Sequence, residues 1–448
     1  MAKVLFIQPN YGTTQFKNIP IAQVTLGTIL INEGNEIKIL DRNIDFRDST
    51  LKAILKEFKP DIVGMTSITG PMLIDIANIA KVVKDNSNSL VIVGGIHATL
   101  DPLCFLNLKT VDYVVRGEGE IVMIEMCKLI DKGKRDFSKL NNVNFNKSNP
   151  PIDINKFPVP DYNLVDVKKY PLIMFITSRG CPWGNCTFCY NARPGYAKNP
   201  LRMYNTENTL KMILPIIEKY NIKEFEIGDD NFGVPNKRTF EVCKALEKYK
   251  VAFHIFQRTD LVREDLMIAL KKAGCWSMQF GFESGSQRIL DLLKKGATIE
   301  QSINAIKMAK KHGIFIDGSF MVGIPGETME DINKTIDFIK KYKPDSVDAK
   351  ILIPYPGTEI YYDCIKNGKI TAPKNLKEWS SFFSKKEGSI NVSDIPTKTL
   401  LETIARLNKK DPLVYFKKFK KLVFSGHANY IKLKLKDIIF KKLGIKKV

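Results

Sequence analysis

The chain has 448 residues, of which 44% are hydrophobic and 26% are charged. These proportions exclude a disordered or fibrous protein, and the length favours two or three domains, because one core rarely extends past about 250–300 residues. No apolar run approaches the roughly 20 residues of a membrane-spanning helix. The start, MAKVLFIQPN, resembles a strand and not a cleavable signal peptide, so we expect a cytoplasmic chain whose eight Cys are buried thiols or metal ligands.

Positive charge is concentrated at the C-terminal end. The formal net charge is +21, and Lys409–Val448 carries 13 Lys against two Asp. Since the rest of the chain is only mildly basic, we expect no nucleic-acid partner. Within this tail, Leu413–Phe424 and Ile431–Leu443 set apolar residues against Lys at near-helical spacing. The pattern is typical either of two solvated helices packed on the body or of a basic amphipathic surface lying peripherally on an anionic inner membrane face.

The first 145 residues alternate short apolar strands with amphipathic helices. This alternation predicts βαβ units and therefore a parallel sheet with helices on both faces. Five strands indicate a flavodoxin-like (Rossmann-like) α/β domain over residues 1–145, with its ligand above the carboxyl ends of the strands. The predicted strands are Lys3–Ile7, Glu36–Leu40, Asp61–Thr66, Leu90–Gly94 and Val111–Val115, and the helices are Ile21–Glu33, Leu51–Lys59, Met72–Lys84 and Glu120–Lys132.

Residues 146–170 lose this periodicity and gain Asn, Lys and Pro, which predicts a linker. A second βα series occupies residues 171–370. Six units are too few for a closed eight-stranded barrel and predict a partial (βα)6 barrel of the TIM type, whose active face is again the carboxyl edge of its strands. The predicted strands are Leu172–Thr177, Lys223–Gly228, Ala252–Phe256, Trp276–Phe282, Phe315–Val322 and Val347–Ile353. Residues 371–448 are predicted to form a small, basic, helical C-terminal region.

Three of the eight Cys lie together after the first strand of the second series, in the segment TSRG-Cys181-PWGN-Cys186-TF-Cys189. Three thiolates this close can hold one face of a four-iron (4Fe–4S) cluster and leave one iron open to another ligand. A structural zinc site would need a fourth Cys or His, and none of the four His is near in sequence. The isolated Cys are predicted to be small buried side chains: Cys104, Cys127, Cys243, Cys275 and Cys364.

A cysteine loop after strand one of a six-unit βα series resembles the radical S-adenosylmethionine (SAM) superfamily. The resemblance implies that Cys181, Cys186 and Cys189 bind the cluster, that the open iron chelates SAM, and that reductive cleavage of SAM yields a 5′-deoxyadenosyl radical. It also implies an electron donor such as a flavodoxin or ferredoxin. The family's usual spacing is C-x3-C-x2-C, whereas four residues separate Cys181 from Cys186. We expect the extra residue to lengthen the loop without removing a ligand.

Motifs at the later strand ends match the family in their order. They are IGDDNF after strand two, FQRTD after strand three, GFESGS after strand four and GIPGET after strand five. The resemblance implies that SAM is bound by Phe188, Gly228, Asp229, Asp230, Arg258, Glu283, Ser284, Gly323 and Pro325. From the residues alone, the two adjacent Asp are equally consistent with a helix cap, and Arg258 with a surface salt bridge to Asp260.

The first domain resembles the cobalamin-binding domain of class B radical SAM proteins. Small residues and hydroxyls at its strand ends would let a bulky macrocycle and its nucleotide tail approach the backbone. The implied contacts are Asn10, Thr66, Ser67, Thr69, Gly94, Gly95, His97, Gly117 and Glu118. The loop PNYGTTQ lacks the His of the motif Asp-x-His-x-x-Gly, so we expect cobalamin to bind without a protein imidazole and His97 to be an edge or tail contact. The alternative is a domain that keeps the fold without the cofactor.

The whole resemblance implies a cobalamin-dependent radical SAM enzyme that functionalises an unactivated carbon by C-methylation. Within the same chemistry, the alternative is an oxidative cyclase or ring-forming enzyme acting on a porphyrin or lipid, similar to anaerobic magnesium-protoporphyrin monomethyl ester cyclase. An alternative of another class is a basic RNA- or membrane-binding protein with a structural metal site. No residue identifies the substrate, which we expect to be a small molecule or lipid-like.

Overall fold

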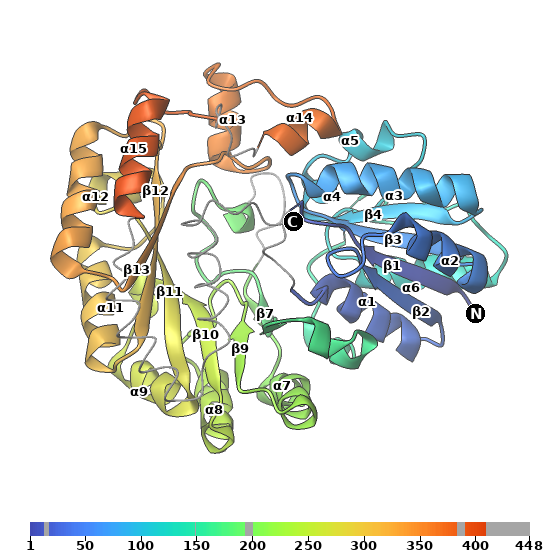
Figure 1. Cartoon of the computed structure of the whole chain (residues 1–448), viewed down its shortest axis with the longest axis horizontal. Coiled ribbons are helices and arrows are strands. Elements are labelled where there is room, and N and C mark those ends of the chain that lie inside the picture. Colours follow the sequence, from blue (N-terminus) through green and yellow to red (C-terminus); the bar gives the residue numbers. More distant parts are fainter. Residues whose placement is uncertain (13–17, 148, 193–199, 383–389, 409–448) are drawn as a thin grey trace. The chain divides into compact units, whose positions relative to one another are not determined.

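The computed structural model describes residues 1–12, 18–147, 149–192, 200–382 and 390–408 (Figure 1). The chain forms two compact units. The first comprises Met1–Tyr170 and Thr371–Ile390, and the second comprises Pro171–Ile370 and the described residues 391–408. The region predicted as one C-terminal piece, 371–448, is therefore divided between the two units. Its two basic amphipathic segments, 413–424 and 431–443, lie outside the described residues.

The first unit is built on a five-stranded parallel sheet with the strand order β2-β1-β3-β4-β5. This order confirms the predicted flavodoxin-like fold. Its strands are β1 (Lys3–Gln8), β2 (Glu36–Asp41), β3 (Ile62–Ser67), β4 (Leu90–Gly95) and β5 (Tyr113–Val114). The helices are α1 (Ile21–Asn32), α2 (Asp48–Phe58), α3 (Met72–Asn86), α4 (Ile96–Leu100), α5 (Leu103–Leu106), α6 (Glu120–Asp131) and α14 (Leu376–Ser381).

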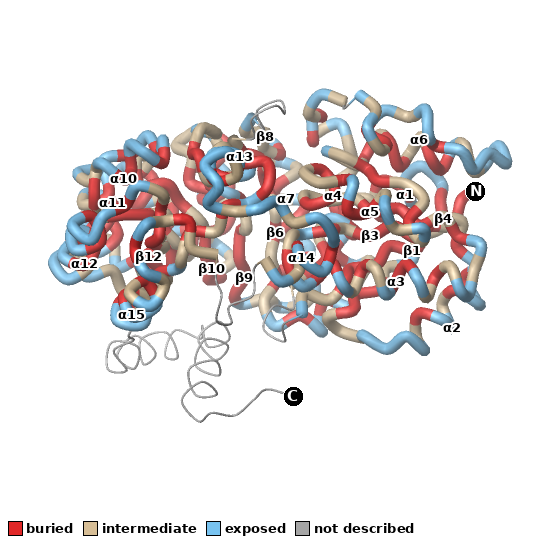
Figure 2. Tube along the Cα trace, turned by 90° about the horizontal axis from the view of Figure 1, so that it is seen from above, coloured by how far each residue is buried: buried red, intermediate tan, exposed pale blue. Residues whose placement is uncertain are grey.

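Helices cover both faces of this sheet, with α1 and α6 on one side and α2 and α3 on the other (Figure 1). The central strands are buried along their length, as Figure 2 shows by colour. In the register of the sheet, Val4 of β1 lies beside Ile37 of β2 and Ile62 of β3. Burial on both faces explains why these strands are runs of apolar residues without polar alternation.

The stretch predicted as a linker, 146–170, packs as part of the first unit. It contains three short 3-10 helices, Ile154–Lys156, Tyr162–Leu164 and Val167–Lys169, and an Asp side chain caps each of them. The buried Tyr170 hydroxyl donates to Asp41 at the end of β2 over 3.0 Å. The turn residues of this stretch are visible in the sequence, but the tyrosine anchor is not, because its partner lies 129 residues away.

The second unit is built on a six-stranded parallel sheet with the order β13-β12-β11-β10-β9-β6. Apart from a small pair, β7 (Ser178–Arg179) with β8 (Arg202–Met203), the strands follow one another in chain order, which confirms the predicted partial (βα)6 barrel. Its strands are β6 (Ile173–Phe175), β9 (Glu224–Ile227), β10 (Ala252–Gln257), β11 (Cys275–Glu283), β12 (Phe315–Val322) and β13 (Ser346–Ile351). The helices are α7 (Thr206–Tyr220), α8 (Lys237–Leu246), α9 (Glu264–Ala273), α10 (Gln287–Leu292), α11 (Ile299–Lys311), α12 (Met329–Tyr342), α13 (Glu359–Lys366) and α15 (Thr397–Leu407).

The last described helix, α15, packs beside the edge strand β13. At its C-terminal end the Asn408 side chain pairs with the backbone of Ala349, accepting from its N–H over 2.7 Å and donating to its carbonyl over 2.9 Å. The amide therefore satisfies backbone groups that a further strand would otherwise bind. Leu400 of α15 also covers Gly323, where an added Cβ would lie 2.9 Å from the leucine side chain.

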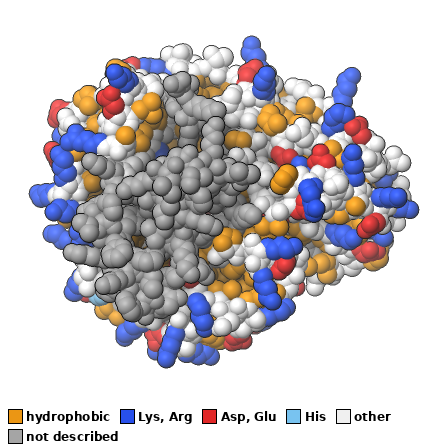
Figure 3. All heavy atoms as spheres, viewed as in Figure 1, with side chains coloured by type: hydrophobic (Ala, Val, Ile, Leu, Met, Phe, Trp, Pro, Cys, Tyr) orange, Lys and Arg blue, Asp and Glu red, His pale blue; other side chains and the backbone are white. Residues whose placement is uncertain are grey.

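Aromatic rings fill the interior of the second unit. Phe225 stacks on Phe253 with ring centroids 5.4 Å apart, and Phe282 stacks on Phe320 at the same separation. No described helix is both long and apolar enough to cross a membrane. In the view of Figure 3, Lys and Arg side chains are spread over both units.

Candidate active site

The cysteine loop of the second unit begins directly after β7 and ends at a 3-10 helix, Tyr190–Ala192. Cys186 is buried, and Cys181 and Cys189 are partly buried. The loop turns at Gly184, whose φ of +58° is a conformation that glycine adopts without strain. The Cys189 N–H then donates to the Cys186 carbonyl over 3.1 Å. The three thiols thus lie at the carboxyl edge of the sheet, as the sequence predicts.

The distances between these thiols bear on whether the loop is a preformed site for one metal ion or a site for a metal cluster. Ligands of one tetrahedral zinc lie within about 4 Å of one another, because zinc–sulfur bonds are about 2.3 Å long. Among the described side chains, the one group with three ligand atoms within 4.8 Å of each other is His97, Asp101 and Cys104, and it includes none of the loop cysteines. The three loop thiols are thus not all within 4.8 Å of one another and form no preformed single-ion site, and three Cys are the ligand set of a 4Fe–4S cluster with one open iron.

A short segment after α10 forms the seat of the cysteine loop. The Leu293 carbonyl accepts from the Thr187 N–H over 3.0 Å, and the Lys294 carbonyl accepts from the Trp183 indole N–H over 2.7 Å. Gly296 completes the seat, because an added Cβ there would lie 2.2 Å from the Trp183 ring. The four-residue spacing between the first two cysteines therefore holds a tryptophan that fixes the loop, which the sequence alone does not reveal.

Two cationic side chains lie close to Cys186. Arg258, at the end of β10, donates to the Lys295 carbonyl over 2.9 Å, and its guanidinium lies 5.6 Å from the centre of the Trp183 ring. Burial raises the pKa of the Cys186 thiol, while Lys295 and Arg258 act to lower it. The cations thus favour the thiolate form that a metal cluster requires. Arg258 does pair with Asp260, but both side chains are largely buried, so the pair is not the surface salt bridge considered from the sequence.

Glu283 binds the second of these cations. Its carboxylate lies 2.8 Å from the Lys295 ammonium, and both side chains are buried. Burial lowers the pKa of Lys295, but the charge and hydrogen bond of Glu283 together with the charge of Cys186 raise that pKa overall. Glu283 also has a φ of +62°, at a shift in the β11–β12 register. In the structure Glu283 is a buried partner of Lys295, and its direct SAM contact stays a prediction.

The two adjacent aspartates after β9 brace the cysteine loop from its two ends. Asp229 is buried and accepts from the backbone N–H groups of Thr177 and Ser178, just before the loop. Asp230 accepts from the Tyr190 hydroxyl over 3.0 Å and from the Asn191 side chain over 2.9 Å, just after it. Neither is the helix cap that the sequence allowed, since Asn236 caps α8. The geometry makes both of them positioning residues for the loop.

The buried charge of Asp229 has its own counter-ion. Arg238 of α8 donates to the Thr177 hydroxyl, which in turn donates to Asp229 over 2.6 Å. Burial raises the pKa of Asp229, and Arg238 opposes that rise. Sequence reasoning did not identify Arg238, because nothing in the periodicity of α8 distinguishes a buried arginine from a solvated one.

Of the other predicted SAM contacts, some lie in the interior of the second unit and others at the carboxyl edge of its sheet. Ser284 is buried and its hydroxyl lies 3.1 Å from that of Thr335 on α12, so it is occupied within the fold. Gly323 faces Leu400, and an added Cβ at Gly228 would lie 2.7 Å from the Met174 sulfur, so packing within the unit accounts for both glycines. Phe188 and Pro325 remain partly exposed at the carboxyl edge.

The loop after β12 contains a carboxylate that the sequence analysis passed over. Glu327 is buried and accepts from the N–H groups of Gly323 and Ile324, which closes the GIPGET turn on itself. Burial raises its pKa to about 7. Its second oxygen, Oε1, is buried without a hydrogen-bond partner. The carboxylate thus stabilises the turn and retains an unused acceptor.

Unpaired polar atoms at neighbouring strand ends fit a polar ligand. The Ser178 hydroxyl, the Asn231 side-chain nitrogen and the Gln257 side-chain oxygen are buried and have no hydrogen-bond partner among the described residues. Ser178 begins β7 in the small β7–β8 pair, whereas Asn231 follows β9 and Gln257 ends β10 at the carboxyl edge of the six-stranded sheet. Unpaired buried polar atoms are unfavourable, so a ligand that pairs with them would be stabilised there. Sequence reasoning missed these three residues, although each is a polar residue at a strand end.

In the first unit, the predicted cobalamin contacts gather around the carboxyl ends of β1, β3 and β4, but several are occupied within the fold. Asn10 donates its N–H to Asp75 over 2.7 Å. The Ser67 hydroxyl donates to the Gly94 carbonyl over 2.7 Å, and Glu118 accepts from the Ile152 N–H over 2.9 Å.

Glycine backbone packing accounts for two more of these positions. Gly95 has a φ of +92°, and an added Cβ would lie 2.6 Å from the Thr66 hydroxyl. Gly117, with a φ of +75°, donates its N–H to Thr99 over 2.8 Å.

The same edge also has features that fit a large, partly apolar ligand. Ile68, after β3, is 43% exposed, and Phe46, after β2, is 70% exposed. Gly70 is buried, yet an added Cβ would meet no atom within 4 Å, so there is space beside it. Exposed apolar side chains next to open backbone are the chemistry expected beside a macrocycle.

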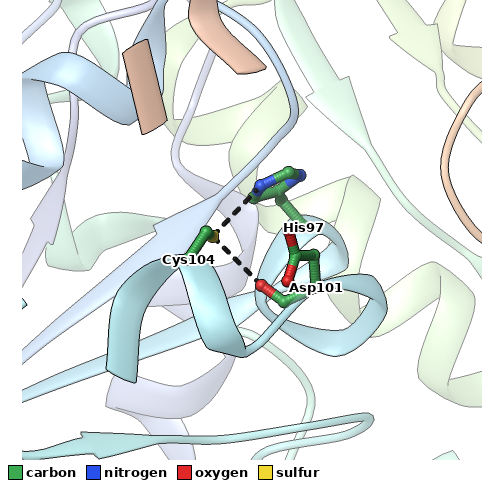
Figure 4. A group of neighbouring side chains, drawn as sticks. All are labelled: His97, Asp101 and Cys104. Atoms are coloured by element: carbon green, nitrogen blue, oxygen red, sulfur yellow. Dashed lines mark hydrogen bonds between the residues drawn. The ribbon is translucent and has the colours of Figure 1, made fainter. Parts of the chain in front are cut away.

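His97 is enclosed within the fold, and each of its ring nitrogens lies beside a neighbouring side chain. It is fully buried, its Nδ1 lies 2.9 Å from the Thr69 hydroxyl, and its Nε2 lies 3.4 Å from the Cys104 sulfur (Figure 4). Trp379 of α14 covers the ring at 5.0 Å between centroids. Burial lowers the pKa of His97 to about 3, so the imidazole is neutral. The structure thus pairs His97 with Thr69 inside the fold, and the cobalamin contacts of both residues stay predictions.

Known proteins share both halves of this architecture. A model of the radical SAM superfamily matches residues 175–339, and a model of the B12 binding domain matches residues 8–126. The chain is 35% identical over 356 residues to an uncharacterized methyltransferase of Pyrococcus horikoshii, which covers 75% of this chain and 77% of that protein. It is 27% identical over 391 residues to the anaerobic magnesium-protoporphyrin IX monomethyl ester cyclase of Rubrivivax gelatinosus, covering 81% and 70% of the two chains.

A solved structure has the same fold. TsrM, a radical S-adenosylmethionine methyltransferase from Kitasatospora setae, matches with a TM-score of 0.77 at 17% identity, over 96% of this chain and 98% of that one. A three-thiol loop at the edge of a (βα)6 sheet, together with a flavodoxin-like domain, defines the class as a radical SAM enzyme with a cobalamin domain. The chain belongs to the radical SAM superfamily, in the branch that carries a B12-binding domain.

The seat of the cysteine loop generates a first prediction. Trp183→Ala removes the indole N–H and the ring that rests on Gly296, and Gly296→Ala fills the same seat from the other side. Each change should lower the iron content after anaerobic reconstitution from about four per chain to below about two. The reason is that the loop would no longer hold the three thiols in the arrangement that one cluster requires. Iron analysis and the electron paramagnetic resonance spectrum of the reduced protein measure this.

Phe145→Ala, which changes an aromatic residue that is 60% exposed in the first unit, serves as the control and should retain full iron content. Unchanged iron and an unchanged spectrum in both seat variants would show that the loop does not depend on this contact.

Proposed function

We propose that the protein transfers a methyl group from SAM to an unactivated carbon of a small-molecule or lipid-like substrate. The observation that carries the proposal is the pairing, in one chain, of a three-thiol loop with a flavodoxin-like domain that matches the B12-binding model. The named relatives support the reaction type, since they include a cytidylyl-2-hydroxyethylphosphonate methyltransferase of Streptomyces wedmorensis at 24% identity over 486 residues.

The proposal assigns each part of the second unit a role. Cys181, Cys186 and Cys189 would hold the 4Fe–4S cluster by three of its irons. SAM would lie over the carboxyl edge, where Asn231 and Gln257 present unpaired polar atoms. When bound, the cluster supplies the electron that cleaves SAM, and cobalamin supplies the methyl group.

The surrounding residues orient this site and exclude water from it. Trp183 and Arg258 close one side of the loop, and the buried Glu283–Lys295 pair lies beside Cys186. Asp229 and Asp230 hold the chain before and after the cysteines. A fixed loop and a dry interior favour radical chemistry, because side reactions of a reactive intermediate with water are reduced.

The radical half of the proposal is tested with Cys186→Ala. This variant should lose most of its iron and form 5′-deoxyadenosine from SAM only at background level when a strong reductant is supplied. Cys243→Ala, a buried cysteine on α8 outside the loop, is the matched control and should retain both properties. Turnover of SAM at the control rate in Cys186→Ala would contradict the assignment of the loop.

A cyclase or other radical oxidation is the second candidate, because the Rubrivivax gelatinosus cyclase is similar over 81% of this chain. The two reactions differ in the fate of the SAM methyl group. With SAM labelled in that methyl, the proposed methyltransferase should place label in the product and form both 5′-deoxyadenosine and S-adenosylhomocysteine. Product formation without label would instead assign the cyclase reaction.

We also propose a low-potential flavodoxin or ferredoxin as the electron donor, and peripheral contact of the basic tail with an anionic membrane. The tail proposal rests on the 13 Lys between Lys409 and Val448. The full chain should sediment with anionic vesicles at low salt, and a chain ending at Asn408 should not. Equal sedimentation of the two chains would contradict membrane contact through the tail.

A further inference from the structure

The first unit contains a second group of metal-ligating side chains, far in sequence from the cysteine loop. His97 on α4, Asp101 in the following turn and Cys104 on α5 place a ring nitrogen, a carboxylate oxygen and a sulfur within 4.8 Å of one another (Figure 4). His97 and Cys104 are buried, and Asp101 is partly buried. Mixed nitrogen, sulfur and oxygen ligands are those that zinc-like divalent ions prefer over magnesium or calcium.

The distances within the group suit a shared ion. The His97 Nε2 and the Cys104 Sγ are 3.4 Å apart. Two ligands of one tetrahedral zinc are separated by about 3.6 Å, since zinc–nitrogen and zinc–sulfur bonds are about 2.0 and 2.3 Å long. Figure 4 shows the Cys104 sulfur joined to the His97 ring and to the main-chain carbonyl of Asp101, to which the thiol donates over 3.0 Å. Small movements of side chains would therefore complete a three-ligand site.

Hydrogen bonds from neighbouring side chains to His97 and Asp101 also support a metal site. The other ring nitrogen of His97 lies 2.9 Å from the Thr69 hydroxyl, and one Asp101 oxygen accepts from the Trp379 indole N–H over 2.6 Å. The second carboxylate oxygen accepts no hydrogen bond within the described chain. Metal-binding His and carboxylate groups characteristically have one atom held by such a partner while the other faces the ion.

We propose that His97 Nε2, Asp101 and Cys104 Sγ bind one divalent ion of the zinc class. Binding replaces the S–H bond of Cys104 by a sulfur–metal bond and releases that proton to solvent, with no change in oxidation state. The imidazole is already neutral and needs no proton removed. The three side chains leave the fourth position of a tetrahedral ion to water. The ion would link the segment after β4 to Trp379 in the part of the chain that returns to the first unit at 371–390. The proposal does not depend on the reaction assigned above.

The test uses the full chain with Cys181, Cys186 and Cys189 all changed to Ala, so that the loop thiols do not compete for metal. After chelator treatment, titration with Co²⁺ should produce a thiolate-to-cobalt charge-transfer band that saturates at about one ion per chain, and Zn²⁺ should displace it. In this background, Cys104→Ser retains the volume of the side chain and should abolish the band. Trp379→Phe, which removes only the donor to Asp101, should weaken Co²⁺ binding about 10–100-fold.

Cys364→Ser, at a buried cysteine of the second unit, is the matched control and should leave the band unchanged. If Cys104→Ser does not fold, as judged by circular dichroism, Asp101→Asn replaces it and should weaken binding at least about tenfold. Absence of the band in the background chain, or a band of equal strength and affinity in Cys104→Ser or Asp101→Asn, would overturn the proposal.

Discussion

Three thiols can share one cluster only if the loop that carries them is held in one conformation, and no helix or strand spans Cys181–Cys189. The seat formed by Leu293, Lys294 and Gly296 meets this requirement. Its carbonyls bind the Thr187 N–H and the Trp183 indole, and the absence of a side chain at Gly296 makes room for the ring. Ordering an irregular segment has an entropic cost of about 1–2 kcal/mol per residue, so contacts from outside the loop must offset it.

Buried charges surround this loop, and each has a partner. Glu283 pairs with Lys295, and Arg238 reaches Asp229 through Thr177. A buried pair contributes little net stability, but the loss of one partner leaves an uncompensated charge and is strongly destabilising. The charges therefore specify one arrangement of the strand ends more than they stabilise the fold. Neighbouring polar atoms that remain unpaired then distinguish the ligand-binding edge from the rest of the interior.

In the first unit, hydrogen bonds from side-chain hydroxyls to the backbone hold the segments at the strand ends. Hydroxyls of Ser67 and Thr99 bind neighbouring carbonyls and N–H groups, and Gly95 lies against the end of β3 without a side chain. These contacts draw the segments after β3 and β4 together and leave Ile68 exposed at the edge. Small residues at these positions hence have two functions: they pack the loops against one another, and they keep the edge open to a large ligand.

The sequence by itself determined the fold class, the enzyme family and the position of the cysteine loop, because strand–helix alternation, strand-end motifs and three closely spaced thiols are local patterns. Tertiary structure decided the roles of individual residues. Asp229, Asp230, Glu283 and Ser284 carry polar groups at strand ends and so are all predicted to contact a ligand, yet each is bound by a residue from another element. His97 is likewise enclosed by Cys104 and Trp379, the second of which is 282 positions further along the chain. Whether a polar side chain faces a ligand or a neighbouring element depends on contacts between distant segments, and only the folded chain brings these together.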